Sequence, residues 1–393
     1  MTDVFDVKNL VDSVSSLLKM GDKPIGLHQP SFRGNEWKYL KDCLDTGWVS
    51  SVGKYVDQFE QELAKFVGVK HAVAVVNGTA ALHVCLLLSE VKANDEILVP
   101  ALTFVATANA IKYCNAIPHF VDSDFKSLGV DPAKLGSYLE SISDMRSDGC
   151  YNKKTGRRIR ALLPVHTFGH PVDLEPLVEI AKRFKLILIE DAAESLGSLY
   201  KNHHTGTYGQ VSATSFNGNK IMTTGGGGAV LTNDSSVAKL AKHMTTTAKL
   251  PHQWAFTHDR VGYNYRLPNI NAALGCAQLE QLPHFIEQKR HLADAYRKTL
   301  SSIKGVQFFV EPEYARSNYW LNTLILNSST FAERDLLLEA FHSKNIQARP
   351  AWQLMHTLSM YADCPRMDLT QAQQLELKIV NVPSSSFLRE NDV

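Results

Sequence analysis

Short apolar segments alternate with helical segments between Lys70 and Asp191, and this alternation constrains the fold more than any other feature. The apolar segments include "HAVAVVNG", "DEILVP", "IPHFVD", "IRALLPVH" and "LILIED". They lack the apolar–polar alternation of half-exposed strands, as is typical of strands that are buried on both faces of a sheet. Strands joined by crossover helices pair mainly in parallel. The sequence therefore predicts an α/β fold with a mainly parallel sheet, whose ligands bind where the strands end.

The segments outside this region predict two further parts of the chain. Helices are expected over Asp6–Lys19 and Asn35–Thr46. A long helical stretch, Asn271–Ser301, contains Pro283, which should kink or break it. The strand-like "VQFFVEP" and "YWLNTLILN" and the helical "AERDLLLEAFHSKN" follow. Because 393 residues exceed what one core usually holds, we predict N-terminal helices and an arm (1–55), a large α/β domain (56–275) and a smaller C-terminal α+β domain (276–393).

The composition argues against several classes of partner. The formal net charge is +1, so no long-range field attracts nucleic acid or an anionic membrane. The basic run Lys153–Arg160 is predicted to be a solvated loop. The six cysteines are scattered without a C-x-x-C pair, which favours reduced thiols over disulfides or a zinc site. The chain begins without a signal-peptide pattern, and no apolar run approaches the roughly 20 residues of a membrane span. We therefore expect a cytoplasmic protein without a bound metal.

Two of the predicted strand ends carry groups that suit a charged ligand. Gly78 and Thr79 follow a strand and open a helix, where free backbone N–H groups and a hydroxyl can hold a phosphate. The alternative is an ordinary turn that Thr79 caps. Asp191 ends the strand "LILIED", where its carboxylate can neutralise a buried cation or cap a following helix. Glu194 is close enough in sequence to share the same site.

His166 and Phe104 lie just beyond two other apolar strands, in "PVHTFGHP" and "PALTFVATANA". A histidine at this position can act in catalysis or support the structure. Phe104 can stack on a flat ring or fill the core. Their place at the same edge of the sheet adds weight to the functional alternative for both.

Lys220 precedes four glycines in "SFNGNKIMTTGGGGAVLTND". The glycines do not form a Walker A loop, because no G-K-[ST] follows at the required spacing. They are not a linker, since the strand-like "GAVLTND" follows directly. A partly buried lysine amine can form a Schiff base, whereas a solvated one has no such role. A phosphate seat, a stacking ring, a buried acid and this amine, each on a different loop of one sheet, are what pyridoxal 5′-phosphate (PLP) requires.

On these residues the sequence resembles the DegT/DnrJ/EryC1/StrS family of sugar aminotransferases, which have the PLP-dependent aspartate-aminotransferase fold (fold type I). The resemblance extends from about Pro24 nearly to the C-terminus. It rests on the ordered motifs "NGTAALH", "VPALTFVATANA", "PVHTFGHP", "IEDAAESLG", "SFNGNKIMTTGGGGAVLTND", "GYNYRLPNINAALG" and "VPSSS". The implied cofactor is PLP, which alternates with its amine form PMP.

By position, the resemblance implies that Lys220 forms the Schiff base with PLP and shuttles the proton. It also implies that Asp191 pairs with the pyridine nitrogen and that Phe104 stacks on the cofactor ring. The residues that correspond to phosphate contacts are Gly78, Thr79 and Ser215. Glu194 and His166 correspond to positions around the ring hydroxyl and the substrate, and His166 is a candidate catalytic residue.

The family resemblance further implies a homodimer with shared active sites. Asn264, in "GYNYR", corresponds to an asparagine that reaches the phosphate site of the neighbouring subunit, and Arg266 would lie near the same site. One position departs from the family, because Gly226 replaces the acidic residue of the usual T-T-G-E-G-G, and we have no account of it from the sequence. Relatives with histidine in place of the lysine are sugar dehydratases, so Lys220 favours transamination.

The segments "NEWKYLKDCLDTGWVSSVGKYVDQFEQELAKF" and "HAVAVVNGTAALHV" look closest to the branch that makes 4-amino-4,6-dideoxy sugars, including the UDP-N-acetylbacillosamine and legionaminic acid pathway enzymes. The implied reaction transfers the amino group of L-glutamate to UDP-2-acetamido-2,6-dideoxy-α-D-xylo-hexos-4-ulose. The alternatives are a GDP- or dTDP-linked 4-keto sugar such as the perosamine precursor, a PLP-binding regulator without turnover, and a nucleotide-binding protein without PLP. Candidate substrate contacts are Trp48, Ser50, Arg266, Arg349 and His356.

Overall fold

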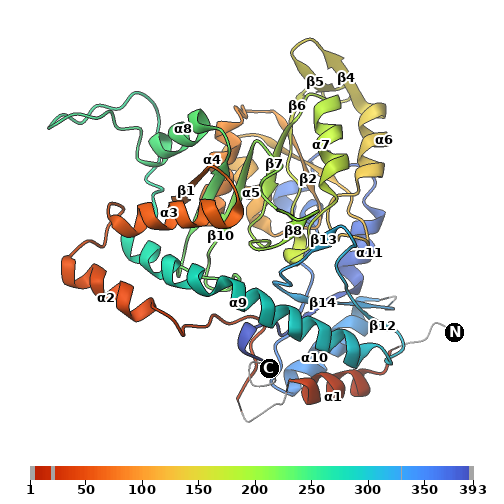
Figure 1. Ribbon diagram of the computed structural model, residues 1–393. Helices are drawn as coiled ribbons and strands as arrows, with labels where there is room; N and C mark the ends of the chain where they lie inside the picture. The colour runs from red at the N-terminus through yellow and green to blue at the C-terminus, as the bar shows by residue number, and fades with distance from the viewer. Residues whose placement is uncertain (1–4, 19–22, 329, 389–393) are drawn as a thin grey trace.

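The computed structural model describes residues 5–18, 23–328 and 330–388, and a mixed sheet of nine strands forms its centre (Figure 1). Seven strands lie side by side in the order β1-β11-β10-β7-β6-β2-β3. Their bounds are β1 (His71–Val75), β2 (Glu96–Pro100), β3 (Ile117–Val121), β6 (Arg158–Leu162), β7 (Ile187–Asp191), β10 (Val211–Ser215) and β11 (Gly228–Thr232). The five from β10 to β3 pair in parallel, and β11 pairs antiparallel with β1 and β10. The predicted α/β sheet, mainly parallel, is confirmed.

Helices cover both faces of this sheet. Ile97 and Val99 of β2 belong to the core that includes α4 and α5, whereas Leu98 belongs to the core of α6 and α7. Successive side chains of a strand point to opposite faces, so burial on both faces explains the uninterrupted apolar segments. The helices are α3 (Lys54–Val67), α4 (Gly78–Leu88), α5 (Val105–Tyr113), α6 (Pro132–Ile142), α7 (Leu174–Arg183) and α8 (Ser235–Thr245).

A hairpin that the sequence did not reveal extends the sheet next to β6. β4 (Ser143–Arg146) pairs antiparallel with β5 (Gly149–Asn152), and β5 pairs with β6. The basic run predicted as a solvated loop therefore divides into a turn and the first residues of β6. The buried carboxylate of Glu96 accepts hydrogen bonds from Asn152 (2.8 Å) and Thr155 (2.6 Å). These bonds hold the turn against the body of the protein.

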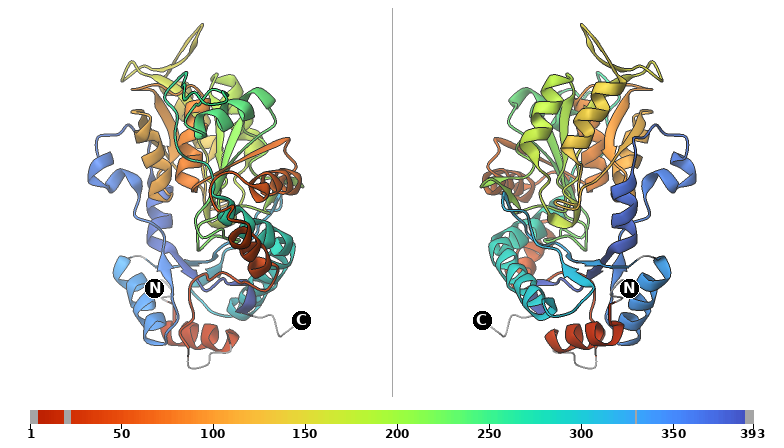
Figure 2. Two further views of the ribbon diagram at one scale, coloured as in Figure 1. Left: turned by 90° about the vertical axis from the view of Figure 1, so that its left-hand side faces the viewer. Right: turned by 90° about the vertical axis from the view of Figure 1, so that its right-hand side faces the viewer.

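A smaller antiparallel sheet lies at the other end of the molecule (Figures 1 and 2). Its elements are β12 (Val306–Phe308), β14 (Asn322–Leu326), β15 (Arg349–Pro350) and β16 (Ile379–Val382), with helices α10 (Phe331–Ser343) and α11 (Thr370–Lys378). The long helix α9 (Asn269–Leu300) joins the two ends of the molecule. Its Leu279 belongs to the core of the large sheet, and its Leu292 belongs to the core of the small one.

The N-terminal helix α1 (Val7–Leu17) packs with the smaller sheet. Leu10 and Val14 cluster with Leu337 and Phe341 of α10. Helix α2 (Glu36–Thr46) contacts α9 instead. The segment 1–55 thus divides between two places, and we propose that α1 belongs to the smaller domain. The predicted end of the first helix at Lys19 lies outside the described residues.

Of the kink or break predicted at Pro283, the break is wrong, because α9 continues through this residue. The neighbouring residues Leu282, Phe285 and Ile286 are buried, whereas Pro283 itself is exposed. A proline inside a helix costs about 3 kcal/mol, and each buried large apolar side chain contributes about 1.5–3 kcal/mol. The buried neighbours therefore offset the cost of the proline.

The remaining elements are short. They are β8 (Leu199–Tyr200), β9 (His203–His204) and β13 (Ala315–Arg316), which form a three-stranded sheet, and the 3₁₀ turns η1 (Thr167–Gly169), η2 (Met355–Thr357) and η3 (Ser359–Tyr361). Among the residues that the structure describes, no helix combines the length and apolar character needed to cross a membrane.

Candidate active site

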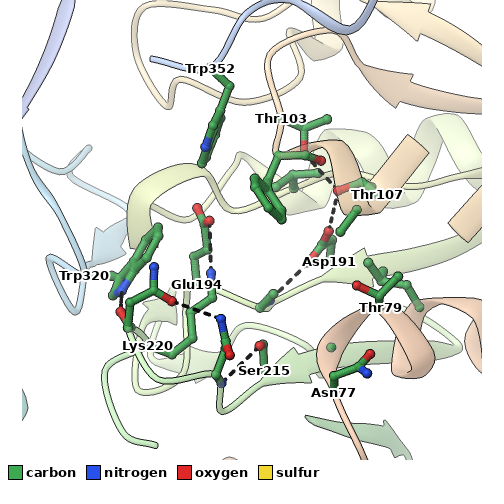
Figure 3. A pocket seen from close by; sticks show the side chains of 18 residues that line it. Asn77, Thr79, Thr103, Thr107, Asp191, Glu194, Ser215, Lys220, Trp320 and Trp352 are labelled. Carbon is green, nitrogen blue, oxygen red and sulfur yellow. Dashed lines mark hydrogen bonds and ion pairs between the residues drawn. The ribbon is translucent and has the colours of Figure 1, made fainter. Parts of the chain in front are cut away.

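A cavity of about 290 Å³ opens at the edge where the parallel strands end (Figure 3). β7 ends there at Asp191 and β10 at Ser215, and helices α4 and α5 begin there. Ligands of open α/β sheets bind at this edge. The predicted site residues that line the cavity are Gly78, Thr79, Phe104, Asp191, Glu194, Ser215 and Lys220.

The amine of Lys220 lies between an acid and an aromatic ring. Its Nζ donates a hydrogen bond to Glu194 Oε1 at 3.2 Å and lies 4.0 Å from the ring centroid of Trp320. The lysine side chain is 12% exposed, so the alternative of a solvated loop lysine is wrong. The structure places one primary amine inside the cavity, where it can react with a carbonyl carbon.

The carboxylate of Asp191 is buried at the end of β7. Thr107 Oγ1 donates to Oδ2 at 2.8 Å, and the Ala193 N–H donates to Oδ1 at 3.1 Å. Turns rather than a helix follow Asp191, so the helix-cap alternative is wrong. Burial raises the pKa of Asp191, and no described basic side chain forms an ion pair with it. A buried carboxylate of this kind suits a cationic group on a ligand.

The start of α4 lies directly beside Ser215 in the lining of the cavity. Asn77 is the N-cap, because its Oδ1 accepts the Ala80 N–H at 2.8 Å, so the alternative in which Thr79 caps the helix is wrong. The first N–H groups of a helix have no intrahelical acceptor and attract anions. A Cβ on Gly78 would lie 2.8 Å from Ser215 Cβ, so only glycine allows this close approach. The resulting cradle suits a phosphate.

Glu194 connects the lysine to a strained turn. Its Oε2 accepts the N–H of Phe168 at 2.8 Å, while Oε1 accepts from Lys220. Phe168 has a φ of 56°, in the left-handed region that non-glycine residues rarely occupy. Burial raises the pKa of Glu194, and the charge of Lys220 opposes this effect. The turn thus fixes one oxygen of Glu194 and leaves the other directed at the amine.

His166 does not line the cavity, which contradicts its predicted catalytic role. Its ring is fully buried, with Nε2 donating to Glu190 Oε2 at 3.0 Å and Nδ1 accepting the N–H of Val172 at 3.3 Å. The preceding residue, Val165, lines the cavity instead. Adjacent residues of an extended segment point to opposite sides, so the side chain of His166 supports the sheet edge from behind.

A second cavity of about 530 Å³ adjoins the first, and the two share Asn219, Trp320 and Trp352. Arg349 lines the second cavity, and no ion pair engages it among the described residues. Phe104, at the first cavity, is 51% exposed, so it does not fill the core. Its ring centroid lies 6.3 Å from that of Trp352. Aromatic rings therefore separate the two cavities.

The structure does not bring the other predicted contacts to either cavity. The carbonyl groups of Trp48 and Ser50 bind Asn269 at the start of α9. Arg266 is buried in an ion pair with Glu60 at 2.7 Å, so its charge is already used within the fold. The positions outside both cavities are Trp48, Ser50, Asn264, Arg266 and His356.

Several cavity residues were missed by the sequence analysis. Asn77 and Thr107 lie inside quoted motifs, one residue before Gly78 and within the first turn of α5. Trp320 and Trp352 come from distant segments, and the sequence contains no local signal that places them here. No cluster of three or more potential metal ligands occurs in the part of the chain that is described.

Comparison with known proteins identifies the relatives of this chain. The model of the DegT/DnrJ/EryC1/StrS aminotransferase family matches residues 30–393. The chain is 39% identical to a GDP-perosamine synthase of Escherichia coli O157:H7, over 94% of the chain and 96% of that protein. It is 34% identical to a GDP-perosamine synthase of Caulobacter vibrioides, with 95% and 97% covered. The crystal structure of DesI with its TDP-sugar product superimposes with a TM-score of 0.81 at 25% identity, covering 92% and 88%.

The names of these curated relatives favour the GDP-linked alternative over the UDP-linked sugar that the sequence analysis put first. The expected family, fold type I and PLP as cofactor are confirmed. The chain belongs to the DegT/DnrJ/EryC1/StrS family of PLP-dependent aminotransferases.

Proposed function

We propose that this protein transfers the amino group of L-glutamate to C4 of a GDP-linked 4-keto-6-deoxy sugar, the precursor of GDP-perosamine. The observation that carries transamination is the convergence of the Lys220 amine and the buried Asp191 carboxylate on one cavity. The names of the relatives that resemble nearly the whole chain support the GDP-linked sugar.

The residues of the cavity have different roles in the proposed transamination. When bound, PLP supplies an electron sink for negative charge on the carbon that exchanges its proton. Asp191 holds a proton on the ring nitrogen by pairing with it. The start of α4 and the Ser215 hydroxyl bind the phosphate, and Phe104 covers one face of the ring. Lys220 Nζ would take a proton from the α-carbon of the amino donor in the first half of the reaction and deliver a proton to C4 of the sugar in the second half, since one amine can serve both halves when its proton state alternates.

Arg349 supports a dicarboxylate as amino donor. Its guanidinium lines the cavity that adjoins the Lys220 site, and a guanidinium binds a carboxylate through two parallel hydrogen bonds. The amide side chains of Gln347 and Asn381 line the same cavity. We propose that a carboxylate of L-glutamate binds there while its amino group faces the first cavity.

The test is Lys220→Ala assayed for 2-oxoglutarate formation with L-glutamate and, in parallel, a GDP-linked and a UDP-linked 4-keto sugar. Loss of a proton-transfer residue should lower the rate by at least about 10²–10⁴-fold. Lys298→Ala, a lysine that is 72% exposed on α9, is the matched control and should retain the wild-type rate. Near-normal turnover by Lys220→Ala would refute transamination through this lysine. A preference for the UDP-linked sugar would refute the substrate assignment.

We also propose that two copies share their active sites. The segment 246–265 after α8 projects from the molecule (Figure 1). It exposes Trp254 (74%), Phe256 (79%) and Val261 (79%), an apolar surface typical of a subunit contact. Asn264 is exposed near the base of this arm and does not line the cavity of its own chain. It is therefore available to the phosphate site of a second copy.

Complementation tests this arrangement. Lys220→Ala and Asn264→Ala should each be inactive alone. After unfolding and refolding together, half of the dimers are hybrids with one intact site, so about one quarter of the wild-type rate should return if the sites are shared. No recovery in hybrids whose formation is verified by tagged copurification would refute the shared site.

A further inference from the structure

We propose that Trp320 positions the amine of Lys220 and that the buried Lys289 fixes Trp320 in turn. The inference rests on the proposed role of Lys220. It gives a positioning role to two residues that lie outside the sequence motifs and that the comparisons do not identify.

Trp320 forms one of the two sides between which the lysine amine is held. The tryptophan is 4% exposed, and its ring centroid lies 4.0 Å from Lys220 Nζ (Figure 3). Glu194 Oε1 contacts the same nitrogen at 3.2 Å. The face of an indole ring attracts an ammonium group, and the attraction is larger where water is excluded. The amine thus has two partners of different kinds, and both restrict where it can lie.

The ring of Trp320 is tied to the loop that carries the lysine. Its Nε1–H donates to the carbonyl of Asn219, the residue directly before Lys220, at 2.7 Å. Its backbone N–H donates to Asn318 Oδ1 at 2.8 Å, and Asn318 Nδ2 donates to the carbonyl of Glu194 at 2.9 Å. The ring, the lysine loop and the acid loop are therefore joined by hydrogen bonds and keep one relative geometry.

Lys289 supplies the remaining fixed point. It lies on α9 with only 1% of its surface exposed, and its Nζ donates to the carbonyl of Trp320 at 3.1 Å and to that of Ser384. Its hydrogen-bond acceptors are these backbone carbonyls, and no carboxylate of the described residues is among them. Burial lowers the pKa of Lys289 well below its usual value. A buried amine is costly, and one that donates to two chain segments beside the reactive lysine serves to hold them together.

Restricting the amine matters because a lysine side chain has four rotatable bonds. A free side chain of this length loses up to about 2 kcal/mol of rotamer entropy when it is ordered. If the ring orders it beforehand, the amine faces the carbonyl carbon of the cofactor for a larger share of the time. The expected effect is on the rate at which the bond to Lys220 forms, rather than on the affinity of the phosphate and ring for the cavity.

The experiment separates these two quantities. Cofactor-free protein is mixed with PLP, samples are reduced with borohydride at intervals, and the covalent adduct is followed by mass spectrometry. In the step that is timed, the Nζ–carbon bond forms, the carbonyl oxygen leaves as water, and Nζ loses its two protons to that oxygen. The affinity for 4-deoxypyridoxine 5′-phosphate, which has no aldehyde, is measured in parallel by calorimetry.

Trp320→Leu should form the adduct about tenfold more slowly, a factor within the rotamer entropy that ordering a lysine side chain removes, with unchanged affinity for the analogue. Trp320→Phe should fall between Leu and the wild type, because phenylalanine keeps a ring face but loses the bond to Asn219. An adduct rate of Trp320→Leu equal to that of the wild type would overturn the proposal. So would an analogue affinity that falls in proportion to the rate, since that would indicate general damage to the cavity.

Lys289→Met removes the donor while keeping an unbranched side chain, and Lys298→Met makes the same change on the exposed face of the same helix. Lys289→Met should slow adduct formation in the same direction as Trp320→Leu, and Lys298→Met should not. If Lys289→Met slows the reaction equally in a Trp320→Leu background, the two residues act independently and the role given to Lys289 is refuted. If Lys289→Met fails to fold, Lys289→Gln, whose neutral NH₂ group keeps donors for both carbonyls, should fold and stay closer to the wild-type rate than Trp320→Leu does; a Lys289→Gln as slow as Trp320→Leu would refute the role. These outcomes are distinct from failure of the proposed function, which the turnover of Lys220→Ala decides.

Discussion

Replacing Glu190 by glutamine should destabilise the protein strongly, although Glu190 does not line the active site. Its carboxylate is fully buried behind the cavity. Oε1 accepts the N–H groups of Tyr208 (2.8 Å) and Gly209 (2.7 Å). Oε2 accepts the N–H of Gly206 (2.7 Å) and Nε2–H of His166 (3.0 Å). Four donors thus converge on two oxygens.

A glutamine can satisfy only half of these donors. If the amide oxygen replaces Oε1, the NH₂ group faces the donors of Gly206 and His166. His166 cannot resolve this by moving its proton to Nδ1, because Nδ1 would then face the N–H of Val172. Each buried polar group left unsatisfied costs about 1–3 kcal/mol, so two cost about 2–6 kcal/mol. That is a large share of the roughly 5–15 kcal/mol by which proteins are stable.

The same contacts predict a dependence on pH. Burial raises the pKa of Glu190, but the hydrogen bonds from His166 and the backbone outweigh it and hold the pKa below its usual 4.5. A lowered folded-state pKa contributes stability that is present above the unfolded-state value and is lost as the pH falls through the folded-state value. When the pH is lowered from neutral to values below about 4.5, the free energy of unfolding should therefore fall less for Glu190→Gln than for the wild type.

Urea unfolding followed by tryptophan fluorescence measures both effects. Glu140→Gln is the control, since Glu140 is 53% exposed in a surface pair with Arg183 and such pairs contribute about 0–1 kcal/mol. If Glu190→Gln unfolds at the same urea concentration as Glu140→Gln at pH 7, the argument from donor counts is refuted, and His166 would again be open to a role other than structural support.

Three further predictions concern the cavity and the glycine run after Lys220. Asp191→Asn keeps an acceptor for Thr107 but no charge, so it should retain PLP while kcat falls by about 10²-fold or more; an unimpaired kcat would exclude pairing with the ring nitrogen. Gly78→Ala should weaken PLP binding, because its Cβ would lie 2.8 Å from Ser215 Cβ, and unchanged affinity in a spectroscopic titration would contradict the cradle. Gly226→Ala should leave the stability unchanged or raise it by about 0.4–1 kcal/mol. Gly227→Ala should lower the thermal midpoint, since its Cβ would lie 2.2 Å from Thr224 Oγ1. Equal thermal midpoints of the two variants would refute the different steric constraints that we assign to these glycines.

The parts of the site that could be predicted are those that follow from order along the chain. Asp191 and Ser215 end strands, and Lys220 follows a strand, so their convergence at one edge is a consequence of parallel pairing. Their residue types then point to the cofactor. The antiparallel hairpin β4–β5 could not be predicted in this way, because its pairing depends on polar contacts such as those of Glu96 rather than on apolar periodicity.

The parts that could not be predicted depend on packing between distant segments. Trp320 reaches the cavity because the segment before β14 crosses the sheet edge, and its neighbours there are Asn219 and Lys289. For His166 the sequence indicated the end of the strand, but it did not predict the direction in which the side chain of His166 points. Alternation is strict within a strand, yet its phase at the first loop residue depends on where the strand ends.

The glycine run directly follows the segment of Lys220, but its close contacts lie elsewhere than at the lysine. Gly225 has a φ of +79°, which favours glycine, and a Cβ on Gly228 would lie 2.6 Å from the carbonyl carbon of Asn77. Gly226 has no such constraint, since its Cβ would lie 3.8 Å from the Val76 oxygen, an ordinary contact. The departure from the family at Gly226 therefore leaves the backbone course intact. What Gly228 allows is the close approach of β11 to Asn77, the cap of α4, so this glycine acts on the end of the cavity where we propose that the phosphate binds, and not on the lysine that precedes the run.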